Sequence, residues 1–211
     1  MRFTQEEFVK VKRILVIYEW AQRTLLTKLG IINEEFINFH ESNPIGYITG
    51  RIKSPESIAQ KLHNLNLNLT AENAIQHIRD IAGIRIICPF AKDIRHLTEI
   101  LRSMQDINIL EEKDYVLNPK PSGYRSYHVI AEIPVFYAGR IENIVVEIQI
   151  RTEAMNFWST LEHNARYKYK DHVPQYLCDE LVVCADKIAE LDHRMFQIHE
   201  IILSMNRGDQ T

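Results

Sequence analysis

The sequence has few of the features that mark secreted, membrane-spanning or thiolate-metal proteins. Three of its 211 residues are cysteines, Cys88, Cys178 and Cys184, and they form no C-x-x-C pair. An odd number of such thiols predicts a reduced, cytoplasmic protein rather than a disulfide framework or a cysteine-bound metal. The first residues lack the apolar core of a signal peptide, and no run is long enough to cross a bilayer, so no membrane partner is expected.

A strong charge of one sign is also missing. The 25 lysines and arginines face 28 aspartates and glutamates, which gives a net charge of −3 and a pI near 6.3. General binding of nucleic acid needs a clustered positive field, so any phosphate recognition in this chain must be local. The Walker A motif, the kinase glycine-rich loop, G-x-G-x-x-G and H-E-x-x-H are all absent, which excludes the commonest nucleotide and zinc frameworks.

The stretch 143–152 predicts a strand with one polar and one apolar face. Side chains alternate along a strand, so its acid, amide and cation share one side, and its branched apolar residues share the other. For this stretch alone, an ordinary half-exposed strand with a solvated polar face is the alternative. The polar residues are Glu147, Gln149 and Arg151, and the apolar ones are Val146, Ile148 and Ile150.

A second polar group is expected where a strand over residues 47–53 ends and a helix begins. Arg51 and Lys53 share one face of that strand, and Ser54, followed by a proline, predicts the N-cap of the helix. Free N–H groups and a positive partial charge make a helix N-terminus suitable for phosphate. Surface decoration by these polar residues is the alternative. The helix residues that would extend a phosphate cradle are Ser57 and Lys61.

A third group surrounds the predicted buried strand 82–89. Arg85 is a cation within an apolar run, which is costly unless the charge is paired or lies at the edge of a site. Asp80 precedes this strand, where it is either a turn residue or a ligand for Mg²⁺.

The loop 118–123, rich in proline and glycine, leads to Tyr124. We expect this side chain to be exposed at the tip of the loop, where its ring could stack on a nucleotide base beside charged phosphate ligands. A core tyrosine at the start of a strand is the alternative. The neighbouring polar candidates are Lys120, Arg125 and His128.

The remaining pattern predicts an α+β fold, a mixed sheet flanked by helices, in three parts. Residues 1–42 should form two helices separated at Gly30, residues 43–170 the catalytic domain, and residues 171–211 one long helix. Residues 127–137 and 144–151 predict a β-hairpin, with Pro134 at a bulge or an edge. Apolar residues repeat without a gap along the last helix, which requires a partner helix: the first helix, within the chain or across subunits. An oligomer is therefore expected.

Two carboxylates at the ends of separate strands suggest the chemistry. If Asp80 and Glu147 lie a few ångströms apart they repel unless a cation lies between them, and Mg²⁺, completed by water and substrate phosphates, is the natural choice. The nearby cations would neutralise a triphosphate, and Tyr124 would remain for a second base. The predicted class is phosphoryl or nucleotidyl transfer.

Four motifs in this order resemble the synthetase domain of the RelA/SpoT family: TGRIKSPESIAQK, RDIAGIRI, SGYRSYH and VEIQIRTEAMNFWSTLEH. A lone domain with helices at both ends is similar to the bacterial small alarmone synthetases. The resemblance implies a nucleotidyltransferase-like mixed sheet, a homotetramer, and transfer of the β,γ-pyrophosphate of ATP to the ribose 3′-hydroxyl of GDP or GTP, which yields (p)ppGpp.

The resemblance also implies roles for residues. Asp80 and Glu147 would hold Mg²⁺, and Glu147 would also activate the 3′-hydroxyl. Arg51 and Arg85 would sandwich the adenine, and Tyr124 would stack on guanine. The ATP phosphates would be bound by Lys53, Ser57 and Lys61, and the acceptor nucleotide by Lys120, Arg125, His128, Gln149, Arg151 and Asn156.

The resemblance also bears on hydrolysis and on regulation. The hydrolase domain of its long members carries a His-Asp pair, and this chain contains no His-Asp dipeptide, so synthesis without hydrolysis is expected. Some small synthetases are activated by their product, but the few basic residues in 21–28 argue against this property here, and the resemblance leaves regulation by alarmone or by single-stranded RNA open. Two other functional classes are alternatives to a synthetase. A polymerase-β-type nucleotidyltransferase would need a Gly-Ser followed by Asp-x-Asp, which is absent, and a non-catalytic oligomeric nucleotide or RNA sensor would not need Glu147.

Overall fold

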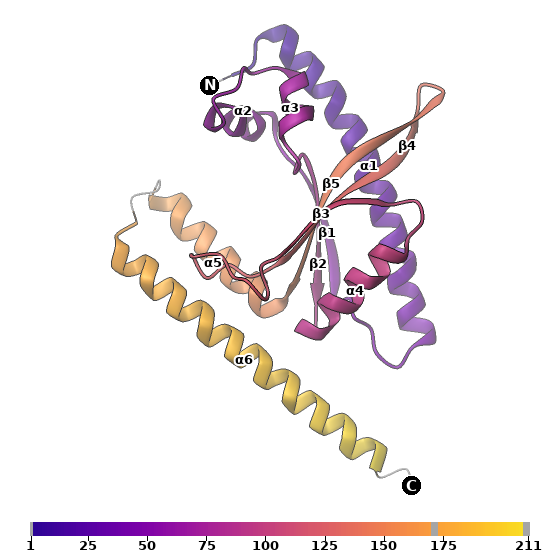
Figure 1. Cartoon of the computed structure of the whole chain (residues 1–211), viewed down its shortest axis with the longest axis vertical. Helices are drawn as coiled ribbons and strands as arrows, with labels where there is room; N and C mark the ends of the chain where they lie inside the picture. Colours follow the sequence, from indigo (N-terminus) through magenta and orange to yellow (C-terminus); the bar gives the residue numbers. More distant parts are fainter. Residues whose placement is uncertain (1, 170–172, 209–211) are drawn as a thin grey trace.

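A mixed five-stranded sheet forms the centre of the molecule. The computed structural model describes residues 2–169 and 173–208 (Figure 1). The strand order is β1-β2-β5-β4-β3, with β2 and β5 parallel and the other neighbours antiparallel. The strands are β1 (Tyr47–Ile52), β2 (Ala82–Cys88), β3 (Asn108–Asp114), β4 (Tyr127–Tyr137) and β5 (Arg140–Thr152).

Helices flank this sheet, as the α+β prediction requires. The helix α1 runs along the sheet, α2 and α3 gather at one of its ends, and α5 leads into the long α6 (Figure 1). The expected domain boundary at 170–171 lies outside the described residues. The helices are α1 (Gln5–Phe39), α2 (Pro55–Asn64), α3 (Ala71–His77), α4 (Ala91–Ser103), α5 (Glu153–Tyr169) and α6 (Gln175–Gly208).

The core lies on the apolar face of the sheet. Val146, Ile148 and Ile150 of β5 are fully buried there, in one cluster with apolar residues of α1 and α4. Burial of such a side chain stabilises the fold by about 1.5–3 kcal/mol. The alternation predicted for 143–152 is confirmed, and it leaves the opposite face of the strand to polar residues.

The helix α1 is continuous, so the predicted stop at Gly30 is wrong. Glycine within a helix costs roughly 1 kcal/mol relative to alanine. Leu25 and Leu29 before it and Phe36 after it are buried. This packing on both sides of Gly30 outweighs the local cost, which illustrates how tertiary contacts override propensity.

Beyond the rest of the sheet, β4 and β5 continue as a two-stranded ribbon (Figure 1). The pairing of β3 with β4 begins at Glu132, so Pro134 lies on a free edge, as predicted for a residue that lacks an N–H donor. Ala138 and Gly139 both have positive φ, 50° and 80°, at the turn. This arrangement is typical of the tight turns that match strand twist.

Within the chain α6 packs against α5 and lies well apart from α1 (Figure 1). An intrachain pair of the first and last helices is therefore wrong, and a partner from another subunit stays a prediction. In the described parts of the chain, no helix combines the length and apolar character needed to span a bilayer. The apolar residues that α6 exposes include Leu177, Leu191, Met195, Ile198, Ile202 and Met205.

Candidate active site

Strand register brings the predicted polar groups together on one face of the sheet. Glu147 lies opposite Gly83 of β2, and Gln149 lies opposite Arg85 on one side and His128 of β4 on the other. Arg51 of β1 pairs with Gly83 and so joins the same row as Glu147. Residues far apart in the sequence thus face one region of space.

Asp80 is held by two lysines. Lys53 Nζ lies 2.8 Å from one carboxylate oxygen, and Lys61 Nζ lies 2.8 Å from the other. Burial alone would raise the pKa of Asp80, but the hydrogen bonds from both lysines outweigh it and hold this pKa below its ordinary value. Asp80 is therefore an ionised group in a cationic setting, which goes beyond the role of a turn residue.

The predicted helix start is confirmed beside this pair. Ser54 is the N-cap of α2, and its Oγ accepts a hydrogen bond of 3.2 Å from the backbone N–H of Ser57. Ser57 Oγ lies 3.0 Å from Ser54 Oγ. Lys53 precedes the cap and Lys61 lies near the end of the helix, so the two cations reach Asp80 from opposite ends of α2.

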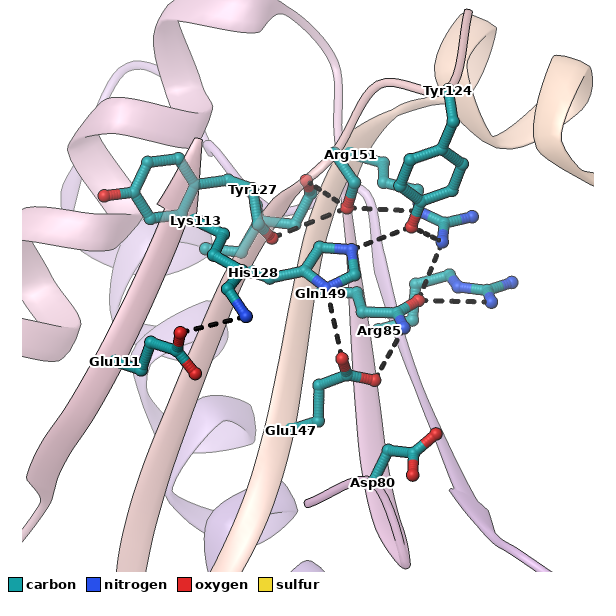
Figure 2. A network of polar contacts seen from close by, with 12 residues as sticks. Asp80, Arg85, Glu111, Lys113, Tyr124, Tyr127, His128, Glu147, Gln149 and Arg151 are labelled. Atoms are coloured by element: carbon teal, nitrogen blue, oxygen red, sulfur yellow. Dashed lines mark hydrogen bonds and ion pairs between the residues drawn. The ribbon is translucent and has the colours of Figure 1, made fainter. Parts of the chain in front are cut away.

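Glu147 has its own two partners (Figure 2). His128 Nδ1 lies 3.1 Å from Oε1, and Gln149 Nε2 donates to Oε2 over 2.8 Å. Burial raises the pKa of Glu147 and so does the charge of Asp80, but the bonds from His128 and Gln149 prevail and the pKa is lowered. Both carboxylates are ionised and close enough to affect each other electrostatically.

Two cavities meet at these carboxylates. Asp80, Glu147 and Gln149 line both of them. The first cavity, of about 280 Å³, is also lined by Arg51, Lys53 and Arg85. The second cavity, of about 500 Å³, is also lined by Lys61, Lys120, Tyr124 and His128.

Tyr124 is half-buried rather than exposed at the tip of its loop, so that expectation is wrong. Its hydroxyl lies 2.8 Å from His128 Nε2 and accepts a hydrogen bond of 2.5 Å from Arg151 (Figure 2). Burial raises the pKa of Tyr124, which keeps the hydroxyl protonated. The ring makes a cation–π contact with Lys120, whose Nζ lies 4.8 Å from the ring centroid. Polar partners at the hydroxyl explain why the side chain folds inward.

Arg85 lies at the edge of the first cavity, and its Nε is buried without a hydrogen-bond partner among the described residues. Arg85 donates to Asn156 Oδ1 over 3.2 Å and to Gln149 Oε1 over 3.4 Å. Asn156 in turn donates to the hydroxyl of Tyr47 over 3.3 Å. Asn156 therefore lies beside an arginine of the first cavity and lines neither cavity.

Other predicted residues surround the cavities without lining them. Arg151 is buried beneath Tyr124, and Arg125 donates to the carbonyl of Val116 and to Asp186. Ser57 also lines neither cavity. Sequence reasoning missed several residues of the second cavity, although one of them, Arg79, directly precedes Asp80. The missed residues are His77, Arg79, Glu111, Lys113 and Tyr115.

The donor set suits a metal that is completed by substrate. Across residues 2–169 and 173–208, no group of three or more histidines, cysteines or acids could hold a metal alone. Asp80 and Glu147 offer carboxylate oxygens to the same cavities. Mg²⁺ is commonly bound by one or two carboxylates together with water and phosphate oxygens. The residues present therefore fit Mg²⁺ held jointly with a nucleotide.

Comparisons with known proteins agree with this arrangement. Residues 50–172 match the model described as a region found in RelA / SpoT proteins. Over 89% of this chain, the GTP pyrophosphokinases YwaC and YjbM of Bacillus subtilis (strain 168) are 44% and 36% identical, and the matches cover 89% and 87% of those proteins.

Solved structures show the same fold. Small alarmone synthetase 1 of Bacillus subtilis, bound to its product pppGpp, superposes with a TM-score of 0.86 at 34% identity, over 91% of this chain and 97% of that one. Small alarmone synthetase 2 of the same organism gives 0.81 at 42% identity, over 90% and 97%. With its nucleotidyltransferase-like mixed sheet and terminal helices, the chain belongs to the RelA/SpoT family.

Proposed function

We propose that the chain is a (p)ppGpp synthetase, a GTP/GDP pyrophosphokinase of the small alarmone synthetase type. The observation that carries the proposal is the meeting of two cation-lined cavities at Asp80 and Glu147. A reaction between two nucleotides needs a donor site and an acceptor site that share one reacting centre. The names of the relatives, GTP pyrophosphokinase and small alarmone synthetase, support the same activity.

In this proposal the first cavity binds ATP. Arg51 and Arg85 supply planar guanidinium groups, which stack on aromatic faces and suit the adenine ring. Lys53 of the first cavity and the N-terminus of α2 near Ser57 supply positive charge for the triphosphate, and Lys61, which lines the second cavity, is held beside them by Asp80. When the phosphates bind, they would compete with Asp80 for the two lysines.

The second cavity binds GDP or GTP. The ring of Tyr124 would stack on guanine in place of the Lys120 ammonium that lies over it, and Lys120 and His128 line the same space for phosphate or ribose. Gln149 lines both cavities, which places it between donor and acceptor. Arg151 holds the hydroxyl of Tyr124 and so acts through that residue.

The reaction follows from this placement. The 3′-oxygen of the acceptor forms a bond to the β-phosphorus of ATP, and the bond from that phosphorus to the oxygen bridging it to the α-phosphorus breaks. The electron pair leaves with AMP. The proton of the 3′-hydroxyl goes to the ionised carboxylate of Glu147, whose position is fixed by His128 and Gln149.

Mg²⁺ would be held by Asp80 and Glu147 with the ATP phosphates. When bound, it neutralises charge on the transferred pyrophosphate. Each carboxylate oxygen has one protein partner in the structure and two lone pairs, so oxygen donors remain for a metal.

Assembly and location complete the proposal. The exposed apolar residues of α6 support an oligomer, because a sustained apolar stripe is stabilised by a partner helix, and the resemblance to the family implies a homotetramer. The free cysteines Cys88, Cys178 and Cys184 support a reducing, cytoplasmic setting. Light scattering of the purified protein tests the assembly. The few basic residues in 21–28 argue against activation by the alarmone, and regulation by single-stranded RNA stays a family-based prediction.

Incubation of the protein with Mg²⁺, ATP and GDP, followed by separation of the nucleotides, tests the activity. We expect AMP and ppGpp in equal amounts, and no release of pyrophosphate from added ppGpp, because the hydrolase motif is absent. Unchanged nucleotides, or AMP attached to another acceptor, would contradict the proposal and favour the sensor or the polymerase-β-type transferase.

A further inference from the structure

The loop 118–126, here called the acceptor loop, carries Lys120 and Tyr124 into the second cavity. Its shape depends on a tight turn, in which Gly123 N–H donates to the Lys120 carbonyl over 2.8 Å and Lys120 N–H donates to the Tyr124 carbonyl over 3.1 Å. Gly123 has φ of +87°, a conformation that side chains disfavour. The turn therefore sets the positions of both cavity-lining residues.

The underside of this turn rests directly on α6. A Cβ added to Gly123 would lie 2.6 Å from Ala185 Cβ and 3.4 Å from Val182 Cα. Ala185 is 4% exposed although the helix around it is largely exposed. The glycine and the alanine are thus both required to be small, and the acceptor loop and α6 pack in direct contact.

Hydrogen bonds of the Arg125 side chain add to this contact. Arg125 donates to Asp186 of α6 over 3.2 Å and to the Val116 carbonyl over 3.1 Å. Its Nε is buried without a hydrogen-bond partner among the described residues, and the side chain lines neither cavity. These contacts are those of a residue that positions the loop, not of one that touches the acceptor nucleotide.

The helix itself is fixed in register on the catalytic domain. Trp158 Nε1 of α5 donates to the Leu181 carbonyl over 2.9 Å, and Thr152 Oγ1 donates to Asp192 over 2.7 Å. These two bonds bracket the segment of α6 that contacts the acceptor loop. The loop therefore packs on a helix that is anchored on both sides of the contact.

We propose that α6 is part of the acceptor site: Ala185 and Asp186, acting through Gly123 and Arg125, hold the acceptor loop in the shape that binds the guanine nucleotide. The inference rests on the proposed function and deepens it. It assigns Arg125 as a positioning residue and makes guanine-nucleotide affinity depend on a helix outside the sheet. The ATP side, formed by β1, β2 and α2, is not held by these contacts.

Substitutions on α6 test the proposal. In Ala185→Leu the larger side chain displaces the turn, and overpacking of this size predicts a rise of about tenfold in the KM for GDP. Asp186→Ala removes a partly exposed ion pair, which predicts a rise of about two- to fivefold. Asp186→Glu should restore most of the affinity, and the KM for ATP should stay unchanged in all three. Glu190→Ala, at an exposed position one turn further along α6, is the matched control.

Calorimetric binding of GDP without ATP gives a readout that does not need turnover. If the wild-type protein forms no ppGpp, the proposed function fails whatever these variants do. If the wild-type protein forms ppGpp, and Asp186→Ala and Ala185→Leu bind GDP as tightly as the wild type and Glu190→Ala do, then α6 does not shape the acceptor site. Equal loss of ATP and GDP affinity would also contradict it. Should Ala185→Leu fail to fold, the Asp186 pair still decides.

Discussion

Replacement of Arg151 tests whether this residue stabilises the fold around Tyr124 or binds the nucleotide directly. Its guanidinium makes four hydrogen bonds: to Ser126 Oγ at 3.3 Å, Ser159 Oγ at 2.9 Å, Gln149 Oε1 at 2.8 Å and the Tyr124 hydroxyl at 2.5 Å. The residue is 3% exposed. Arg151→Met keeps the aliphatic volume and loses every one of these bonds.

The size of the effect follows from burial. Each buried polar partner left unsatisfied costs about 1–3 kcal/mol, and part of this is offset because the charge no longer needs to be buried. We expect the free energy of unfolding to fall by about 3–5 kcal/mol, in the range seen when one partner of a buried charged network is removed. For a chain of this length that corresponds to a drop in Tm of roughly 10 °C.

The assay is thermal unfolding followed by circular dichroism at a fixed protomer concentration, because assembly makes Tm concentration-dependent. Arg51→Met is the matched control: Arg51 is exposed, so its loss should change Tm by less than about 2 °C while it weakens ATP binding. A Tm for Arg151→Met within that same small interval of the wild-type value would refute the reasoning that Arg151 is structural support for Tyr124.

Two further predictions concern the end of β5 and the metal. Thr152→Val should lower the free energy of unfolding by about 1–2 kcal/mol in urea titrations, because Thr152 Oγ1 accepts from Met155 N–H at the start of α5 and donates to Asp192. The control Thr160→Val removes only an exposed hydrogen bond to a helix carbonyl and should change this free energy by less than about 0.5 kcal/mol. Equal effects of the two substitutions would contradict a stabilising role for Thr152. Chelation with EDTA should abolish nucleotide turnover and leave Tm within about 2 °C of its value, because only two protein carboxylates would hold the ion; a large loss of Tm would indicate a structural metal.

Short-range patterns predicted much of the fold. The two-residue period of 143–152 predicted which side chains of β5 face the core, and Ser54 before a proline predicted the start of α2. These signals work because they depend on residues adjacent in sequence. The positions of Asp80 and Glu147 near the ends of separate strands suggested that the two carboxylates could share one site, and both line the two cavities.

Features that depend on distant neighbours could not be predicted in this way. The continuity of α1 through Gly30 is set by packing on both sides of that residue, and the inward position of Tyr124 is set by His128 and Arg151. The orientation of Arg125 toward α6 depends on contact with Asp186, which lies 61 positions further along the chain. Sequence spacing carries no information on such contacts.

In the proposed reaction Glu147 lies where the donor and acceptor nucleotides meet, because it lines both cavities together with Asp80 and Gln149. The most direct measurement compares wild-type protein with Glu147→Gln for ppGpp formation from ATP and GDP, with the binding of each nucleotide measured separately. We predict a loss of turnover of about 10³-fold, because a proton acceptor and a metal ligand are removed together, with both nucleotides still bound and Tm little changed. Turnover retained within about tenfold of wild type would contradict the claim, and so would loss of the fold itself.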